Sequence, residues 1–357
     1  MRRARIRAWV AGLAMLAACG LPAAVHAVDQ PFVPKPPTLQ QGQQEVKDEK
    51  AQPLNNAPTW RDVRSGETFV TQVKGIDTGI LVQSGGETWK TIQTRFLIPY
   101  GGLLLGGVVA AFALLYLWRG SMRLHGPRTG RKIPRFTAWE RGIHWTVATL
   151  WLILAVTGML MLFGRHVVIP IFGHTAFSWI AQIAKNLHNF VGPLFLVSAI
   201  LIFLTFVRRN LPHSSDLQWL RNFPAAVFAK KGDPPAGFFN AAEKIVFWAG
   251  LGVLAVVAGV SGLILNFPNF DQGRAVMQTA QVVHAVSGVL FIALMLSHIY
   301  MGTIGTEGSL EAMREGTVDE QWAKEHHALW YDEVVREQRR GRAAGGSLPA
   351  GAPAQRL

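Results

Sequence analysis

The sequence predicts an all-α integral membrane protein, in which a four-helix transmembrane bundle follows one extra transmembrane helix and a small extracytoplasmic N-terminal segment. Half of the 357 residues are hydrophobic and only 16% are charged, a balance typical of membrane proteins. Crossing the hydrocarbon layer of a bilayer takes about 20 apolar residues. Five uncharged apolar runs are long enough: 96–118, 143–163, 187–207, 245–267 and 280–301.

The first 27 residues resemble an export signal. Arginines precede a short apolar stretch, and Val25-His26-Ala27 suits signal peptidase, so we expect residues 1–27 to be removed. The alternatives are an uncleaved sixth helix and lipidation of Cys19, which follows a lipobox-like Leu16-Ala17-Ala18. Cys19 is the only cysteine, so the mature chain has no ligand for an iron–sulfur cluster and no thioether attachment for haem.

Residues 28–95 are expected to lie outside the membrane, in the periplasm. Their first half is rich in Pro, Gln and charge and predicts an exposed linker. The second half alternates β-forming residues and is broken at Gly75 and at Gly85-Gly86, which predicts a small β element. The run 96–118 carries no ionisable residue and is interpreted as the extra transmembrane helix.

The net charge of +13 could indicate nucleic-acid binding, but its distribution indicates membrane topology instead. Lys and Arg number seven in 119–142, two in 164–186, six in 208–244, one in 268–279 and seven after 301. Dense and sparse loops alternate, as the positive-inside rule requires. We therefore expect a bacterial inner membrane protein with a periplasmic mature N-terminus, a basic cytoplasmic loop at 119–142 and a cytoplasmic C-terminus, and no nucleic-acid partner.

The region after the last span is also assigned to the cytoplasm. Residues 302–340 are charged, with apolar residues at helical spacing, which predicts amphipathic helices at the membrane surface. The final residues, 341–357, are rich in Gly, Ala and Pro and predict a disordered tail. The adjacent His326 and His327 are expected to be solvated or to contact another subunit.

Four histidines lie inside the predicted spans, where ionisable residues are rare and usually functional. They are His144, His188, His284 and His298. The fourteen residues between His284 and His298 correspond to about 21 Å along a helix and return to nearly the same face. By depth, His188 and His284 form an outer pair, and His144 and His298 an inner pair.

Two axial imidazoles at each level are a common way to hold haem for electron transfer, so the sequence predicts a dihaem cytochrome b bundle with two haem b groups. Glycines four residues after His188 and His284, Gly192 and Gly288, would let a flat macrocycle approach. A metal site without haem would need converging ligands. A proton relay usually recruits Asp or Glu, which the four bundle spans lack.

The histidine motifs resemble those of the gamma subunits of respiratory formate dehydrogenases, which are dihaem cytochromes b. The matching stretches are "RGIHWTV" (141–147), "NLHNFVG" (186–192), "VVHAVSG" (282–288), "LSHIYMG" (296–302) and the tail "GSLEAMREGTVDEQWAKEHHALWY" (308–331). The resemblance covers about residues 139 to 335. It implies the same haem pairing, His188 with His284 and His144 with His298, in a subunit that contains no catalytic residue of its own.

The resemblance also implies partners. A molybdenum or tungsten catalytic (alpha) subunit would oxidise formate, an iron–sulfur (beta) subunit would relay electrons, and this chain would pass them to quinone near the cytoplasmic side. The family's quinone-site asparagine matches Asn240. Ala242 stands where members can carry glycine, which puts a backbone contact there in doubt. From the residues alone, Asn240 is interpreted as the N-cap of a helix that starts at Ala241, and its quinone role is implied by the resemblance.

Two other functions remain open. A cytochrome b of a hydrogenase or another periplasmic oxidoreductase would have the same haem ligands and a different electron donor. A haem-free membrane anchor or transporter would use the histidines only for packing between helices.

Overall fold

The computed structural model describes residues 64–65, 69–70, 80–82, 84–229 and 232–343. The chain divides into two compact units, Met1–Gln83 and Ser84–Leu357. The expected signal peptide, Cys19, the linker and nearly all of the expected disordered tail lie outside the described residues. In the first unit, strands β1 (Phe69–Val70) and β2 (Ile80–Val82) pair antiparallel, as expected of a small β element.

The second unit begins with one long helix made of α4 (Ser84–Thr91), the π-helical turns η2 (Ile92–Leu97) and α5 (Ile98–Arg119). The β-forming pattern does end before Gly85-Gly86, as expected, but a helix follows, and both glycines lie in the first turn of α4. Tertiary packing overrides the weak helix propensity of glycine. Here α4 contacts α10 (Arg274–Tyr300), and Gly85 is close enough that an added Cβ would lie 3.8 Å from the Gln278 amide oxygen.

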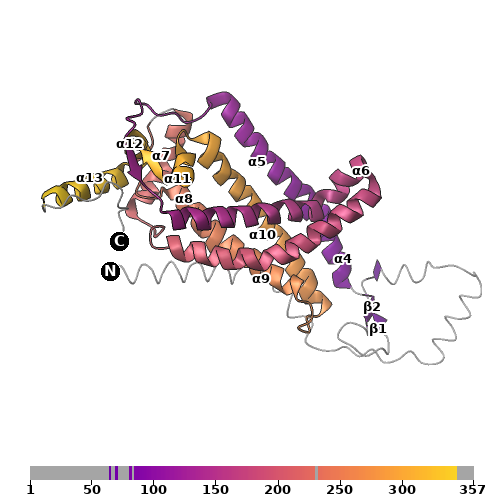
Figure 1. Cartoon of the computed structure of the whole chain (residues 1–357). Coiled ribbons are helices and arrows are strands. Elements are labelled where there is room, and N and C mark those ends of the chain that lie inside the picture. The colour runs from indigo at the N-terminus through magenta and orange to yellow at the C-terminus, as the bar shows by residue number, and fades with distance from the viewer. Residues whose placement is uncertain (1–63, 66–68, 71–79, 83, 230–231, 344–357) are drawn as a thin grey trace, which may run out of the picture. The chain divides into compact units, whose positions relative to one another are not determined.

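Helix α6 (Ala138–Phe206) begins with a capping box between Thr137 and Glu140. It contains the second predicted span and all of the third except its last residue, Val207, which is the C-cap. Gly173, with φ 78° and ψ 174°, is the one non-helical residue inside it. That φ is strained for residues with a Cβ, so the glycine divides α6 into two arms, and Figure 1 shows the helix running to one end of the bundle and returning.

The remaining bundle helices are α10 and a continuous helix formed by α8 (Ala241–Ile245), η3 (Val246–Leu254) and α9 (Ala255–Asn266). Helix α10 packs against α9 and α5, and α6 packs against α9. Within the described residues, four helical stretches are long and apolar enough to cross a membrane. They are Gly85–Arg119, Ala138–Phe206, Ala241–Asn266 and Arg274–Gly305.

One end of the bundle carries a folded polar layer, here named the cap and defined as residues 120–137 and 306–334. Strand β3 (Lys132–Pro134) pairs antiparallel with β4 (Thr317–Asp319), and the turns η4 (Met301–Gly305) join α10 to α11 (Ser309–Glu315). Helices α12 (Glu320–His326) and α13 (Ala328–Ala343) follow. Helix α7 (Ser214–Phe228) lies at the same end (Figure 1).

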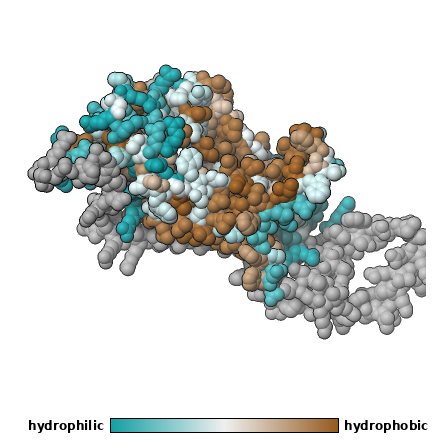
Figure 2. Space-filling model, in the orientation of Figure 1, coloured by the Kyte–Doolittle hydropathy of each residue, from teal (hydrophilic) through white to brown (hydrophobic). Residues whose placement is uncertain are grey.

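The cap shares its hydrophobic core with the bundle. Phe206 and Phe291 of the bundle belong to the same buried cluster as Val318, Trp322 and Trp330 of the cap. The expectation that the tail's apolar residues lie against the membrane surface is therefore wrong for those three, which are at most 4% exposed. Figure 2 shows hydrophilic residues gathered over the cap and hydrophobic ones over the helices.

Candidate functional site: two histidine pairs and the outer cavity

The four span histidines meet as two pairs, the ones expected from depth. His188, on the second arm of α6, faces His284 on α10, with ring centroids 5.9 Å apart and planes at 82°. His144, on the first arm of α6, faces His298, with centroids 6.2 Å apart and planes at 62°. Two imidazoles on opposite sides of one metal ion, each at about 2 Å, have ring centres about 6 Å apart. Both separations suit a shared metal between the rings.

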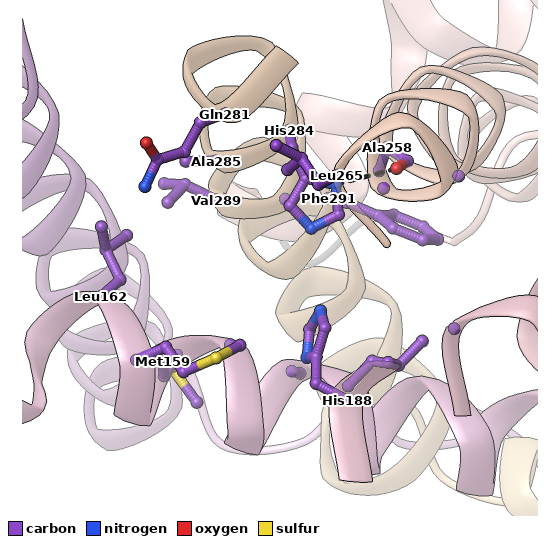
Figure 3. A pocket seen from close by; sticks show the side chains of 18 of the residues that line it. Met159, Leu162, His188, Ala258, Leu265, Gln281, His284, Ala285, Val289 and Phe291 are labelled. Atoms are coloured by element: carbon purple, nitrogen blue, oxygen red, sulfur yellow. Dashed lines mark hydrogen bonds between the residues drawn. The ribbon is translucent and has the colours of Figure 1, made fainter. Parts of the chain in front are cut away.

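A cavity of about 410 Å³ opens beside the outer pair. Figure 3 shows His188 and His284 pointing toward one another across it, with Met159 and Leu162 on one side. Helices α4, α6, α9 and α10 all contribute to its wall, which is mostly apolar and carries a few polar groups, among them Lys185 and Gln281. An apolar pocket with few polar groups is typical of a cofactor site.

Glycines shape the cavity wall. Gly192 and Gly288, expected to admit a flat group, both line the cavity, and a Cβ added at either would meet nothing within 4 Å. Two further glycines lie directly against the imidazole rings. A Cβ at Gly158 would lie 3.3 Å from Cε1 of His188, and one at Gly262 would lie 3.0 Å from Cε1 of His284. These residues fit a planar macrocycle bound through two imidazoles.

Sequence reasoning missed Gly158 and Gly262, together with the hydroxyl residue that precedes each one. Thr157 Oγ1 lies 2.8 Å from Nδ1 of His188, and Ser261 Oγ lies 3.4 Å from Nδ1 of His284. The backbone carbonyl of Ala258 is closer still, at 2.8 Å from the same Nδ1. The repeated dipeptides Thr157-Gly158 and Ser261-Gly262 were the available signal, but only the packing of the helices shows which histidine each one faces.

The inner pair is held differently. Nδ1 of His144 is buried without a hydrogen-bond partner among the described residues. Gly302, four residues after His298, again leaves open space where a Cβ would be. The described part of the chain holds no cluster of three or more His, Cys, Asp or Glu side chains that could bind a metal ion. Two ligands at each site match a macrocycle that supplies the other four.

Asn240 caps the helix that begins at Ala241. Its side-chain oxygen accepts a hydrogen bond from the Glu243 backbone N–H at 3.0 Å, and its backbone N–H donates to the Glu243 carboxylate at 2.7 Å. The N-cap interpretation is therefore confirmed. Ala242 packs against the small cluster of Trp219, Ala236 and Ala241, and the expected quinone contact of Asn240 and Ala242 stays a prediction.

His326 and His327 are buried, so the expectation that they are solvated is wrong. They are 7% and 2% exposed. His326 Nδ1 lies 2.6 Å from an Asp233 carboxylate oxygen, and His327 Nδ1 donates to the Gly237 carbonyl at 2.7 Å. Burial, together with the neighbouring Arg135 guanidinium, lowers the pKa of His327 well below its ordinary value.

Arg135 occupies the centre of the cap. Its guanidinium lies about 5 Å from the ring centroids of Phe238, Trp322 and Trp330 and donates to the Phe238 carbonyl at 2.6 Å. Burial lowers the pKa of Arg135 to about 10. His327 and Arg135 thus form a buried structural contact, 3.2 Å between Nε2 and Nη2, which joins the tail to the loop before α6.

The comparisons with known proteins agree with this geometry. The prokaryotic cytochrome b561 family model matches residues 135–316, a range that contains all four paired histidines and Asn240. The cytochrome b556(fdo) subunit of formate dehydrogenase from Escherichia coli K12 is 34% identical over 211 residues, which are 57% of this chain and 93% of that protein.

Two further relatives carry similar names. The cytochrome b556(Fdn) subunit of the nitrate-inducible formate dehydrogenase from Escherichia coli K12 is 30% identical over 56% of this chain and 90% of its own length. The formate dehydrogenase cytochrome b556 subunit of Haemophilus influenzae is 28% identical over 57% and 84%. The chain therefore belongs to the prokaryotic cytochrome b561 family, as a multi-pass membrane cytochrome b of the formate dehydrogenase subunit type.

Proposed function

We propose that this chain carries electrons from the iron–sulfur subunit of a respiratory formate dehydrogenase through two b haems to quinone. The proposal rests on the two histidine pairs. The ring centroids are 5.9 Å apart in the His188–His284 pair and 6.2 Å apart in the His144–His298 pair, and the histidines lie on helices that can cross a membrane. The catalytic partner would hold molybdenum or tungsten. Bound haem would supply reversible one-electron chemistry, with both axial positions filled by protein.

The chain's own residues bind, orient and insulate the two haems. His188 and His284 would hold the outer one in the apolar cavity, and Lys185 and Gln281 in its lining suit the propionate groups. His144 and His298 would hold the inner one next to the cap. Within the spans, apolar side chains exclude water from the electron path.

The basic segments support an orientation with the cap in the cytoplasm, the mature N-terminus in the periplasm and the bundle in the bacterial inner membrane. Electrons would enter at the outer pair and reduce quinone near the inner pair. The reduction takes two electrons and two protons to form quinol, and the protons come from the cytoplasm. Each charge moved across the membrane stores about 2.3 kcal/mol per 100 mV.

Asn240 is proposed to contribute to the quinone site, because it stands at the cytoplasmic start of the α8–α9 helix. Its oxygen is engaged in the helix cap, which leaves the amide N–H groups to contact a quinone carbonyl. Ala242 lies two residues further along the chain and would offer only its backbone and methyl surface. Quinone and lipid are then the small-molecule partners, and the alpha and beta subunits are the protein partners.

A reduced-minus-oxidised visible spectrum with haem quantification tests the proposal most directly. We expect two b-type haems for each purified chain, with formate dehydrogenase subunits co-purifying. Subunits of a different periplasmic oxidoreductase would keep the haem assignment and replace the electron donor. If the purified chain contains no haem, the histidines serve only in packing between helices.

The His284→Ala variant tests the electron path. We expect it to lose one haem and at least a hundredfold in quinone reduction, while formate oxidation by a soluble dye survives. His166→Ala, an exposed histidine of the same protein on α6, is the matched control and should keep both haems. Normal quinone reduction in His284→Ala would overturn the proposed path.

A further inference from the structure

We infer that hydrogen bonds to the second nitrogen of each outer histidine give the outer haem the lower midpoint potential, and that Thr157 is the positioning residue that tunes it. The inference rests on the haem ligation proposed above. It concerns a difference between the two pairs that the four ligands alone do not show, because all four are histidines.

The Thr157 hydroxyl determines the tautomer of His188. Its own hydrogen is directed to the Ile153 carbonyl of the same helix, at 2.7 Å. Its lone pairs therefore face Nδ1 of His188, 2.8 Å away, and Nδ1 must carry the hydrogen and donate it. Nε2 is left with a bare lone pair, which is the form that ligates a metal.

His284 is held in the same tautomer by a stronger acceptor. The Ala258 carbonyl, 2.8 Å from Nδ1, can only accept, so Nδ1 must donate. Ser261 Oγ is more distant, at 3.4 Å, and directs its own hydrogen to the Val257 carbonyl at 2.6 Å. Both outer imidazoles thus donate from Nδ1 to an oxygen on a neighbouring helix segment.

Among the described residues, the inner histidines have no such acceptor. The buried Nδ1 of His144 has no hydrogen-bond partner within the described residues. For His298, the described part of the chain shows a ring contact with His144 and no hydrogen bond from either ring nitrogen. The two pairs therefore differ at Nδ1, while their centroid separations differ by only a few tenths of an ångström.

This difference affects the metal through the ligand. A histidine that donates its second N–H to a carbonyl or hydroxyl is a more basic ligand, and a more basic axial ligand stabilises ferric over ferrous iron. A haem held by His188 and His284 would then be the weaker oxidant, and electron transfer from it to the inner pair would be favourable. This difference in midpoint potential offsets the electrostatic work of moving an electron toward the negative side of an energised membrane.

The test is an optical redox titration of the purified complex, with haem content measured for every variant. Thr157→Val removes the hydroxyl acceptor 2.8 Å from Nδ1, leaves the Leu154 backbone as the remaining acceptor for His188, and keeps the side-chain shape. We expect both haems to remain and the lower of the two midpoints to rise, by an amount corresponding to about a tenfold change in the electron-sharing equilibrium, or about 59 mV for one electron. Thr157→Ser, which keeps a hydroxyl, should return the midpoint to its original value.

Thr205→Val is the matched control. Its hydroxyl also bonds back to its own helix, at the Leu201 carbonyl, but contacts no histidine among the described residues, so neither midpoint should move. If Thr157→Val loses a haem, Ser261→Ala replaces it, and the lower midpoint should rise by a smaller amount because that hydroxyl is farther from Nδ1. A shift of the upper midpoint, or no shift in variants that retain both haems, overturns the inference. Absence of haem from the unmodified chain would instead refute the proposed function.

Discussion

The bundle and the cap use apolar residues in opposite ways. The bundle has a buried core, but many of its large apolar side chains face outward: Leu117 is 80% exposed and Phe190 is 70% exposed. In the cap they face inward, where Val318 and Trp322 are 0% and 4% exposed. The first arrangement is stable only in lipid and the second only in water. An apolar stripe on a helix therefore does not by itself predict whether that face contacts lipid or packs into a core.

Charged residues show the same contrast. The basic loop before α6 pairs with acidic residues of the tail, as in Arg128 with Glu311 at 2.6 Å and Lys132 with Glu311 at 3.1 Å. Buried hydrogen-bond acceptors also join the two segments. The Asp319 carboxylate accepts hydrogen bonds from the backbone N–H groups of Gly130 and Gln321. The cations that indicate topology in the sequence thus also bind the two halves of the cap together.

The largest expected effect comes from a change inside the cap core. Trp322→Ala removes a buried ring beside Arg135 and should destabilise the cap by about 3–5 kcal/mol. Leu117→Ala, on the lipid-facing surface, should change stability by no more than about 0.5 kcal/mol. Thermal unfolding in detergent, with protease cleavage of the tail as a second measure, checks both. Equal effects would remove the contrast between the two regions.

A smaller effect is expected from filling space inside the bundle. Gly262→Ala places a methyl group 3.0 Å from Cε1 of His284 and should cost about 1–3 kcal/mol through overpacking, with reduced occupancy of the outer haem. Gly107→Ala, where a Cβ meets nothing within 4 Å, is the control. Haem content per chain, measured after purification, is the readout. An unchanged haem content in Gly262→Ala would show that the outer pair has room to shift.

Acid should loosen the cap before the bundle. The folded pKa of His327 is depressed, so its stabilisation is fully present above the unfolded pKa of about 6.5 and falls by up to about 1.4 kcal/mol per pH unit below it. The pKa of Glu325 is also depressed, to about 2, because hydrogen bonds from His125, Gln321 and Gly126 outweigh its burial. Its contribution is lost further down, between its ordinary value of 4.5 and about 2.

Protease digestion of the tail at pH 7.5 and pH 5.5 measures the first of these losses. Cleavage should be several times faster at the lower pH, and His327→Asn, whose amide can still donate to the Gly237 carbonyl, should weaken the pH dependence. A cleavage rate that is the same at both pH values would contradict a buried neutral His327.

The smallest effect is expected at the cap surface. Arg128 is 42% exposed at its side chain and pairs with Glu307 and Glu311. Arg128→Ala should therefore cost less than about 1 kcal/mol, and the loss should shrink further at high salt. The same thermal unfolding assay, run at two salt concentrations, measures this loss of stability. A loss comparable to that of Trp322→Ala would mean that charge, rather than the apolar core, holds the cap.

Much of the architecture could be predicted because the relevant signals are local. Apolar length predicts spans in lipid, and the predicted run 280–301 falls inside α10 and η4. The start of α4 at Ser84 could not be predicted in this way, because its glycines are weak helix formers and its helix depends on contact with α10. The burial of the tail was missed for a similar reason: the partners of His326 and His327 lie between 90 and 192 residues earlier in the chain.

The sequence by itself determined the all-α membrane fold and the pairing of the four histidines, because helix rise and periodicity place His284 and His298 on one face at two depths. Only the tertiary structure decided what holds those histidines. Thr157 is 31 residues from His188, and Ala258 is 26 residues from His284. Contacts between separate helices, or between the two arms of α6, are set by packing and leave no periodic signal in the sequence, so the difference between the outer and inner pairs emerges only in the folded chain.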